Sequence, residues 1–181
     1  MRFELNITLT ESDYVAFNRF HAIESTQGKK TIRNSRILFV SIIAVLMILF
    51  VFSMGWTAFS ALYVTIMALF TTVYCLFFKK ILIRNLEAQI KKMKKSGKLP
   101  FDPISKAEFY EDKFADISPS KRMELGYEAL ERICILDEQY IFLYQSSVTA
   151  HILPIPQIKA QICYDDFLSF LFQKCSKVEH Y

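Results

Sequence analysis

The most constraining feature of this 181-residue chain is a run of 42 residues, Ile37 to Phe78, without any charged side chain or histidine. A helix that crosses a bilayer needs about 20 apolar residues, so the run is long enough for two helices. Gly55, its only glycine, and Trp56, the only tryptophan of the protein, lie near its middle. Because tryptophan favours the membrane–water interface, we place a tight turn there. The run therefore predicts a transmembrane helical hairpin of residues 37–54 and 57–78.

Charge is distributed unevenly around this hairpin. The net charge is +2 over residues 1–36, +7 over residues 79–98 and −5 over residues 99–181, within a formal total of +4. Basic residues flank both ends of the apolar run and the turn has none, so the positive-inside rule predicts that both termini are cytoplasmic. We expect a multi-pass protein of the cell (inner) membrane. The basic excess beside the hairpin points to an anionic membrane surface rather than to nucleic acid.

Two sets of residues near the hairpin are candidate sites. The basic segment keeps helical periodicity, and each cation near an anionic surface contributes about 1 kcal/mol of binding; the alternative is that these cations only set the topology. The candidate anionic-lipid contacts are Lys79, Lys80, Arg84, Lys91, Lys92, Lys94 and Lys95. In the second helix, small residues recur at spacings of three and four, which is typical of a helix-packing face in lipid. This candidate face comprises Ala61, Thr65, Ala68, Thr72 and Cys75, with Ser41 and Ala44 as matching small positions of the first helix.

The segments outside the hairpin predict folded parts. Residues 3–9 alternate apolar and polar side chains, which indicates a strand. Thr10 is placed to cap a helix over about residues 11–25 that ends at Gln27-Gly28. The last third predicts a small antiparallel β-domain. Its strands are expected at about 105–111, 113–118, 121–126, 130–136, 139–145 and 148–153, with hairpin turns at 112–113, 118–120 and 137–138 and a final helix from Asp165-Asp166.

These elements predict a membrane α+β protein in four parts. They are a cytoplasmic strand–helix segment (1–36), the hairpin (37–78), a basic juxtamembrane helix (79–98) and a cytoplasmic β-domain with a closing helix (99–181). A glycine and two prolines between residues 97 and 103 indicate the linker before the β-domain.

No residue pattern indicates catalysis, a metal or a cofactor. The sequence lacks nucleophile-elbow, P-loop, dinucleotide-binding and zinc-protease motifs. Cys75, Cys134, Cys163 and Cys175 form no CxxC pair, which favours free thiols. Adjacent residues of a helix point in different directions, so helix-start electrostatics explains Asp165-Asp166 better than a metal site does.

The histidines and the aromatic residues give equally little support for a catalytic, metal-binding or nucleic-acid-binding role. We expect His21 and His151 to be packed side chains rather than bases or ligands. Tyr140, Phe142 and Tyr144 alternate along one strand face and are of the kind that stacks nucleobases. However, the surrounding segment is acidic, which opposes phosphate, and the apolar residues between them favour a strand that is buried on both faces.

Several short segments resemble the YcxB-like family of bacterial membrane proteins. They are Leu9-Thr10-Glu11-Ser12-Asp13-Tyr14-Val15-Ala16-Phe17-Asn18 with Phe20-His21, then Tyr140-Ile141-Phe142-Leu143-Tyr144, Ile152-Leu153-Pro154 and Asp166-Phe167-Leu168. Gly126-Tyr127-Glu128-Ala129-Leu130 departs from the P-W-x-D-I segment that is typical of such proteins. The resemblance implies a cytoplasmic β-domain similar to bacterial pleckstrin-homology-like domains.

The sequence thus favours a non-enzymatic, membrane-anchored interaction or regulatory module. Its expected partners are the bilayer, anionic lipid headgroups and a protein partner or second copy, with no cofactor and no nucleic acid. The alternative is an oligomeric membrane assembly or small pore formed by the hairpin. Transport is disfavoured, because the apolar run has no ionisable side chain of the kind that marks ion pathways.

Overall fold

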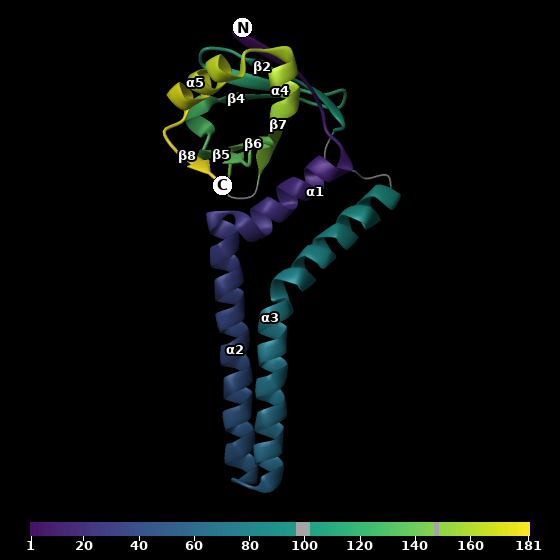
Figure 1. Ribbon diagram of the computed structural model, residues 1–181, viewed down its shortest axis with the longest axis vertical. Coiled ribbons are helices and arrows are strands. Elements are labelled where there is room, and N and C mark those ends of the chain that lie inside the picture. The colour runs from purple at the N-terminus through teal and green to yellow at the C-terminus, as the bar shows by residue number, and fades with distance from the viewer. Residues whose placement is uncertain (97–101, 147–148) are drawn as a thin grey trace. The chain divides into compact units, whose positions relative to one another are not determined.

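The computed structural model describes residues 1–96, 102–146 and 149–181 (Figure 1). The predicted linker from Gly97, the first residue of the strand expected at 148–153 and the side chain of Lys94 lie outside this description. The chain forms two compact units. One comprises residues 1–18 and 90–181 and is called the β unit below; the other comprises residues 19–89 and is called the helical unit.

Two long helices form most of the helical unit, as the apolar run predicts. They are α2 (Thr26–Met54) and α3 (Ala58–Lys95), and both are long and apolar enough to cross a membrane. Large apolar side chains along them are exposed, including Phe52 at 91% and Leu76 at 73%. Exposure of so continuous an apolar surface to water is unfavourable, whereas contact with lipid tails carries no such cost. The expectation that the second helix continues through the basic segment is confirmed, since α3 ends at Lys95.

The turn between the helices lies where glycine and tryptophan predict it. Gly55 has a φ of 69°, in the region that glycine adopts without a steric penalty. The Thr57 and Ser60 side chains each accept a hydrogen bond from the other residue's backbone N–H, at 3.2 and 2.8 Å. This reciprocal capping satisfies two of the first N–H groups of α3. Trp56 is 75% exposed at the tip.

The start of α2 differs from the prediction at Gln27-Gly28. Helix α1 (Glu11–Arg19) continues into a π-helical turn, Phe20–Glu24, and Ser25 caps α2 by accepting a hydrogen bond from the Gly28 N–H at 3.0 Å. Gly28 therefore lies inside the first turn of α2 instead of ending a helix. Its backbone approaches the π-helical turn so closely that a Cβ would lie 2.5 Å from the His21 carbonyl oxygen. The glycine is needed for close approach, not for termination.

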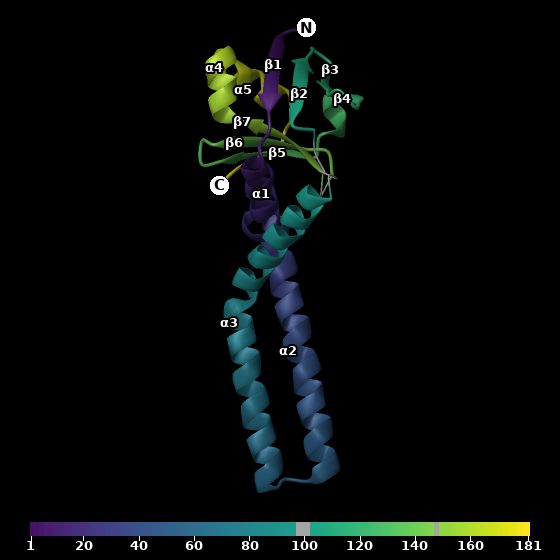
Figure 2. The same ribbon diagram turned by 90° about the vertical axis from the view of Figure 1, so that its right-hand side faces the viewer.

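The β unit contains two four-stranded sheets (Figures 1 and 2). The first has the order β1 (Phe3–Thr8), β2 (Ile104–Phe109), β3 (Lys113–Ile117) and β4 (Arg122–Gly126), all antiparallel. The second has the order β7 (Ala150–Pro154), β6 (Tyr140–Tyr144), β5 (Arg132–Leu136) and β8 (Val178–His180). All seven predicted strands are present. The eighth, β8, was not predicted and pairs in parallel with β5.

The N-terminal strand belongs to the same sheet as the strands of the last third. Phe3 pairs with Phe109 and Thr8 with Ile104, across more than ninety intervening residues. The sequence indicates a strand here but not its partner, and residues 1–18 lie in the β unit rather than in a separate N-terminal segment. The hairpin turn at Asp137-Glu138 has φ angles of 42° and 55°, which matches the tight turn predicted there.

The hydrophobic core lies between the two sheets. Inward side chains of the first sheet, such as Leu5 and Phe114, meet those of the second, such as Ile141 and Leu153. Helix α5 (Tyr164–Lys174) adds Phe167, Phe170 and Leu171, and its first turn carries the two aspartates as predicted. A further helix, α4 (Ile155–Gln161), was not predicted. Two prolines flank Ile155: Pro154 ends β7, and Pro156 lies in the first turn of α4, where proline is tolerated.

Helix α1 packs on the outer face of the second sheet. Its Phe17 ring lies 5.3 Å from the ring of Phe142 and 6.1 Å from that of Tyr144. The Tyr140 hydroxyl donates a hydrogen bond to Asp13 Oδ1 at 2.8 Å, and its burial together with this carboxylate raises the pKa of Tyr140 to about 12. Phe142 and Tyr144 are thus fully buried, as expected, and Tyr140 is half-buried. This burial argues against base stacking.

Candidate functional site

The contact between α2 and α3 is aromatic. The ring centroids of Phe39 and Tyr74 lie 4.1 Å apart, as do those of Phe50 and Tyr63. The small residues that were predicted to form a helix-packing face lie elsewhere: Thr65, Ala68 and Thr72 are exposed, and Ala61 and Cys75 are half-buried. Both helices offer aromatic side chains at helical spacing, so ring packing brings them together inside the hairpin. The small-residue face remains a prediction only for pairing between chains.

A pocket lined by cations lies where the apolar run begins and ends. Lys29, Arg33 and Arg36 follow one another at spacings of four and three on one side of α2, and Lys79 joins them from α3. The pocket has a volume of about 310 Å³, and Ile32 and Ile37 supply its apolar wall. Arg36 and Lys79 are the residues directly before Ile37 and directly after Phe78, so the pocket occupies the level at which hydrocarbon would meet headgroups.

Arg36 in this pocket has spare hydrogen-bonding capacity. Arg36 Nε is buried without a hydrogen-bond partner, and the guanidinium carbon lies 5.8 Å from the centroid of the Phe78 ring. Within the described part of the chain, no ion pair to a carboxylate involves Arg33, Arg36 or Lys79. Arg33, Arg36 and Lys79 thus place positive charge that is available to an anionic group beside an apolar wall.

Of the predicted lipid contacts, only Lys79 lines this pocket. Lys80, Arg84, Lys91, Lys92 and Lys95 are exposed along α3, and for Lys94 the side chain lies outside the described residues. In the sequence, Lys29, Arg33 and Arg36 counted only among the basic residues before the apolar run, from which the membrane topology was predicted. Their spacing on one helical face, level with Lys79 across a hairpin, was the signal that could have identified them.

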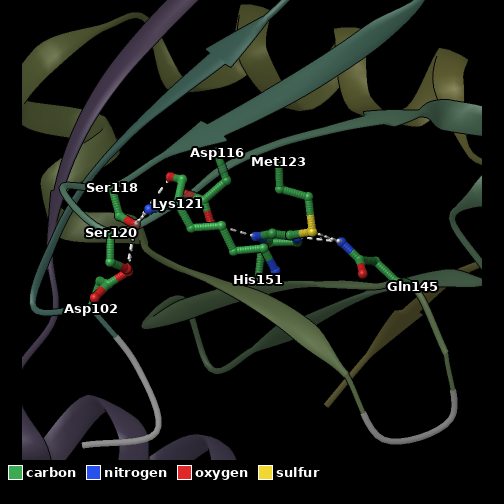
Figure 3. Close-up of polar contacts among 8 residues, drawn as sticks. All are labelled: Asp102, Asp116, Ser118, Ser120, Lys121, Met123, Gln145 and His151. Atoms are coloured by element: carbon green, nitrogen blue, oxygen red, sulfur yellow. Dashed lines mark hydrogen bonds and ion pairs between the residues drawn. The ribbon is translucent and has the colours of Figure 1, made fainter.

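The β unit contains a second site, a cavity at one end of the core (Figure 3). Side chains alternate along a strand, so Asp116 and Ser118 share the inward face of Phe114. The same alternation on β7 turns His151 inward with Leu153. The inner layer is therefore apolar at one end and polar at the other. The cavity has a volume of about 230 Å³, which is room for several waters or one small organic molecule.

Beside this cavity, a line of hydrogen bonds joins the two sheets (Figure 3). His151 Nδ1 lies 2.8 Å from Asp116 Oδ2, and His151 Nε2 lies 2.5 Å from Gln145 Nε2. Because an amide nitrogen only donates, Nε2 of the histidine accepts and Nδ1–H donates to the carboxylate. The ring also meets Phe114 edge to face, at 5.0 Å. His151 is thus packed, as expected, but it has a carboxylate partner from the other sheet that sequence spacing did not reveal.

Asp116 is only half satisfied by this line. Its second oxygen, Oδ1, is buried and has no hydrogen-bond partner within the described residues. A buried acceptor without a partner costs about 1–3 kcal/mol, and more when it is charged. Asp116 was the sequence signal for this site, because it is an inward-facing charged residue that follows Phe114 and Ala115 in the strand.

Asp102 and Lys121 add opposite charges to the lining. The Asp102 carboxylate accepts hydrogen bonds from Ser118 Oγ and from Ser120 Oγ, and these bonds hold the pKa of Asp102 below its usual value. Asp102 is therefore ionised at neutral pH. The cavity then has two carboxylates against one lysine, and most of its other lining residues are apolar or aromatic.

Metal binding and thiol chemistry find no support in the described part of the chain. No group of three or more histidine, cysteine, aspartate or glutamate side chains is arranged to hold a metal there. All four cysteines are free, as expected. Burial raises the pKa of Cys134 to about 12, which keeps this thiol protonated and unreactive.

The fold defines a protein with two long apolar helices, a small mostly antiparallel β region and a C-terminal helix. Comparison with family models, curated proteins and solved structures finds no match. The resemblance to the YcxB-like family therefore stays a prediction, based on the short segments that suggested it.

Proposed function

We propose that this protein is a non-enzymatic, membrane-anchored binding module that holds an anionic lipid headgroup at its cation pocket. The hairpin α2–α3 is the anchor of a multi-pass protein of the cell membrane, with both termini cytoplasmic. The β unit is the part that interacts with a protein partner or ligand, in the manner of the pleckstrin-homology-like domains that the family resemblance implies.

One observation carries the proposal: Lys29, Arg33, Arg36 and Lys79 converge on one pocket beside the apolar helices. Topology alone requires positive charge near the hairpin ends, but it does not require cations of both helices to line the same cavity. Arg36 supports the proposal further, since its buried Nε would otherwise lack a hydrogen bond. A phosphate offers several acceptor oxygens to such a cluster.

Lipid titration of the full-length protein, followed by native mass spectrometry, tests the proposal. We expect phosphatidylglycerol to bind more tightly than phosphatidylcholine. Because each cation contributes about 1 kcal/mol, the double substitution Arg33→Gln/Arg36→Gln should weaken phosphatidylglycerol binding by about tenfold or more.

The matched control is Lys80→Gln/Arg84→Gln, which removes the same charge from exposed positions outside the pocket. It should change the dissociation constant by less than about twofold, because neither Lys80 nor Arg84 lines the pocket that is proposed to hold the headgroup. Equal loss in both double variants would show diffuse charge attraction, and equal binding of the two lipids would remove the proposal.

The second candidate is an oligomeric assembly or small pore. It is favoured by the exposure of Thr65, Ala68 and Thr72, which leaves the small-residue face uncovered by α2. Thiol cross-linking in native membranes discriminates, because Cys75 continues this face. Covalent dimers that disappear in Cys75→Ser support assembly, and a monomer at every cross-linker concentration opposes it.

A further inference from the structure

We infer that the cavity of the β unit binds a small organic ammonium ion, with the amine on Asp116 and an apolar body between the sheets. This site is separate from the cation pocket of the helical unit, and it goes beyond the proposed function. The inference starts from Asp116, whose side chain is 29% exposed but whose Oδ1 is buried without a hydrogen-bond partner among the described residues.

The position of Asp116 is enforced from both sides. Its neighbours across the sheet are Ala107 on β2 and Met123 on β4, neither of which offers a hydrogen-bond donor from its side chain. His151 occupies Oδ2 and is itself held by Gln145 and by the ring of Phe114. The carboxylate is therefore oriented before any ligand arrives, which lowers the entropic cost of binding.

Charge favours a cation at the empty acceptor. The lining has Asp102 and Asp116 against Lys121, and Lys121 is exposed whereas Asp116 Oδ1 is buried. An ammonium group brings up to three donors and a full positive charge, so it satisfies the buried oxygen better than a neutral hydroxyl does. A metal ion is the poorer candidate, because the described residues provide no third ligand.

The apolar lining of the cavity indicates which substituent the bound ammonium group has. Most of the lining is apolar, from Ile7 on one sheet to Leu143 on the other, and Phe17 adds an aromatic ring. Apolar surface buried in such a cavity contributes about 25 cal/mol per Å². A cavity of about 230 Å³ suits an alkyl or aryl amine rather than a peptide or a lipid.

Isothermal titration of the full-length protein in a neutral detergent tests this inference with three probes of one shape. They are 2-phenylethylamine, 2-phenylethanol and phenylacetate. We expect saturable binding of the amine, weaker binding of the alcohol and none of the carboxylate. Asp116→Asn keeps the shape and removes the charge, and should weaken amine binding at least tenfold.

Two further variants make the outcome decisive. Asp112→Asn removes an exposed acid of the same unit that does not line the cavity, and should leave amine binding unchanged. Ala107→Leu fills the cavity, leaves every charged residue in place and should abolish amine binding. The thermal unfolding midpoint reports whether each variant is folded. Equal binding of all three probes, or amine binding unchanged in folded Asp116→Asn, would overturn the inference. So would the absence of saturable amine binding, which would leave ordered water as the partner of Asp116.

Discussion

At the scale of single residues, the structure gives several side chains roles that their residue type does not announce. Gly28 is a helical glycine, and in an exposed helix its replacement by alanine would stabilise the protein by about 1 kcal/mol. Here the backbone of the π-helical turn lies in the way, with atoms of His21 and Ala22 within 2.5–2.6 Å of the position that a Cβ would take. Gly28→Ala is therefore expected to lower the stability of the protein instead of raising it.

We predict that Gly28→Ala destabilises the helical unit by about 1–3 kcal/mol, the range of overpacking substitutions. The thermal unfolding midpoint in detergent should fall accordingly. Gly126→Ala is the control, because its Cβ would meet only the flexible end of the Glu128 side chain, at 3.2 Å. A midpoint for Gly28→Ala at or above that of the unsubstituted protein would contradict the close approach.

At the scale of elements, α4 protects the edge of the first sheet. Gln157 and Gln161 lie one turn apart, and their side-chain amides bind the outer backbone groups of β1. Gln157 donates to the Thr8 carbonyl at 2.7 Å and accepts from its N–H at 2.9 Å. Gln161 pairs with Asn6 in the same way, at 2.9 and 2.8 Å. Two side chains thus replace a neighbouring strand, at an edge that would otherwise be open to pairing with another chain.

The double substitution Gln157→Ala/Gln161→Ala should lower the free energy of unfolding by about 1–2 kcal/mol, because water replaces part of the lost hydrogen bonding. It should also increase self-association through β1, measurable by light scattering against protein concentration. Lys159→Ala, an exposed position on the same helix, should change neither property. An unchanged association state of the double variant would argue that the edge is protected by other means.

At the scale of the whole molecule, the two long helices carry the proposal of a membrane protein, because both are long and apolar enough to cross a bilayer. Their exposed apolar side chains would be stabilised if lipid replaced water around them. We therefore predict that the protein stays in the membrane pellet after alkaline carbonate extraction. A reporter fused after Tyr181 should be active only if it is a cytoplasmic reporter, because basic residues flank both ends of the hairpin. Release by carbonate would refute membrane insertion, and an externally active reporter would refute the topology.

Local patterns sufficed for much of the fold. The uncharged run gives the two helices and their turn, because transfer of a helix into lipid depends on composition and length. Period-two alternation located β1, short β-favouring stretches between turns located six further strands, and the acidic first turn located α5. β8 was missed because three residues, Val178–His180, carry too little pattern. Helix α4 was missed because it has only seven residues and a proline, Pro156, lies in its first turn.

The candidate sites depended on partners that are distant in sequence. The residues near His151 in the sequence do not predict its contact with Asp116, because this contact joins strands of different sheets. The cation pocket likewise needs α2 and α3 side by side before Arg33 and Lys79 line the same space. The sequence by itself determined which segments avoid water and which secondary structure each adopts, since both follow from local periodicity and charge. Only the tertiary structure decided which strands pair and which polar groups lose their water, because burial is a property of packed neighbours and not of a residue.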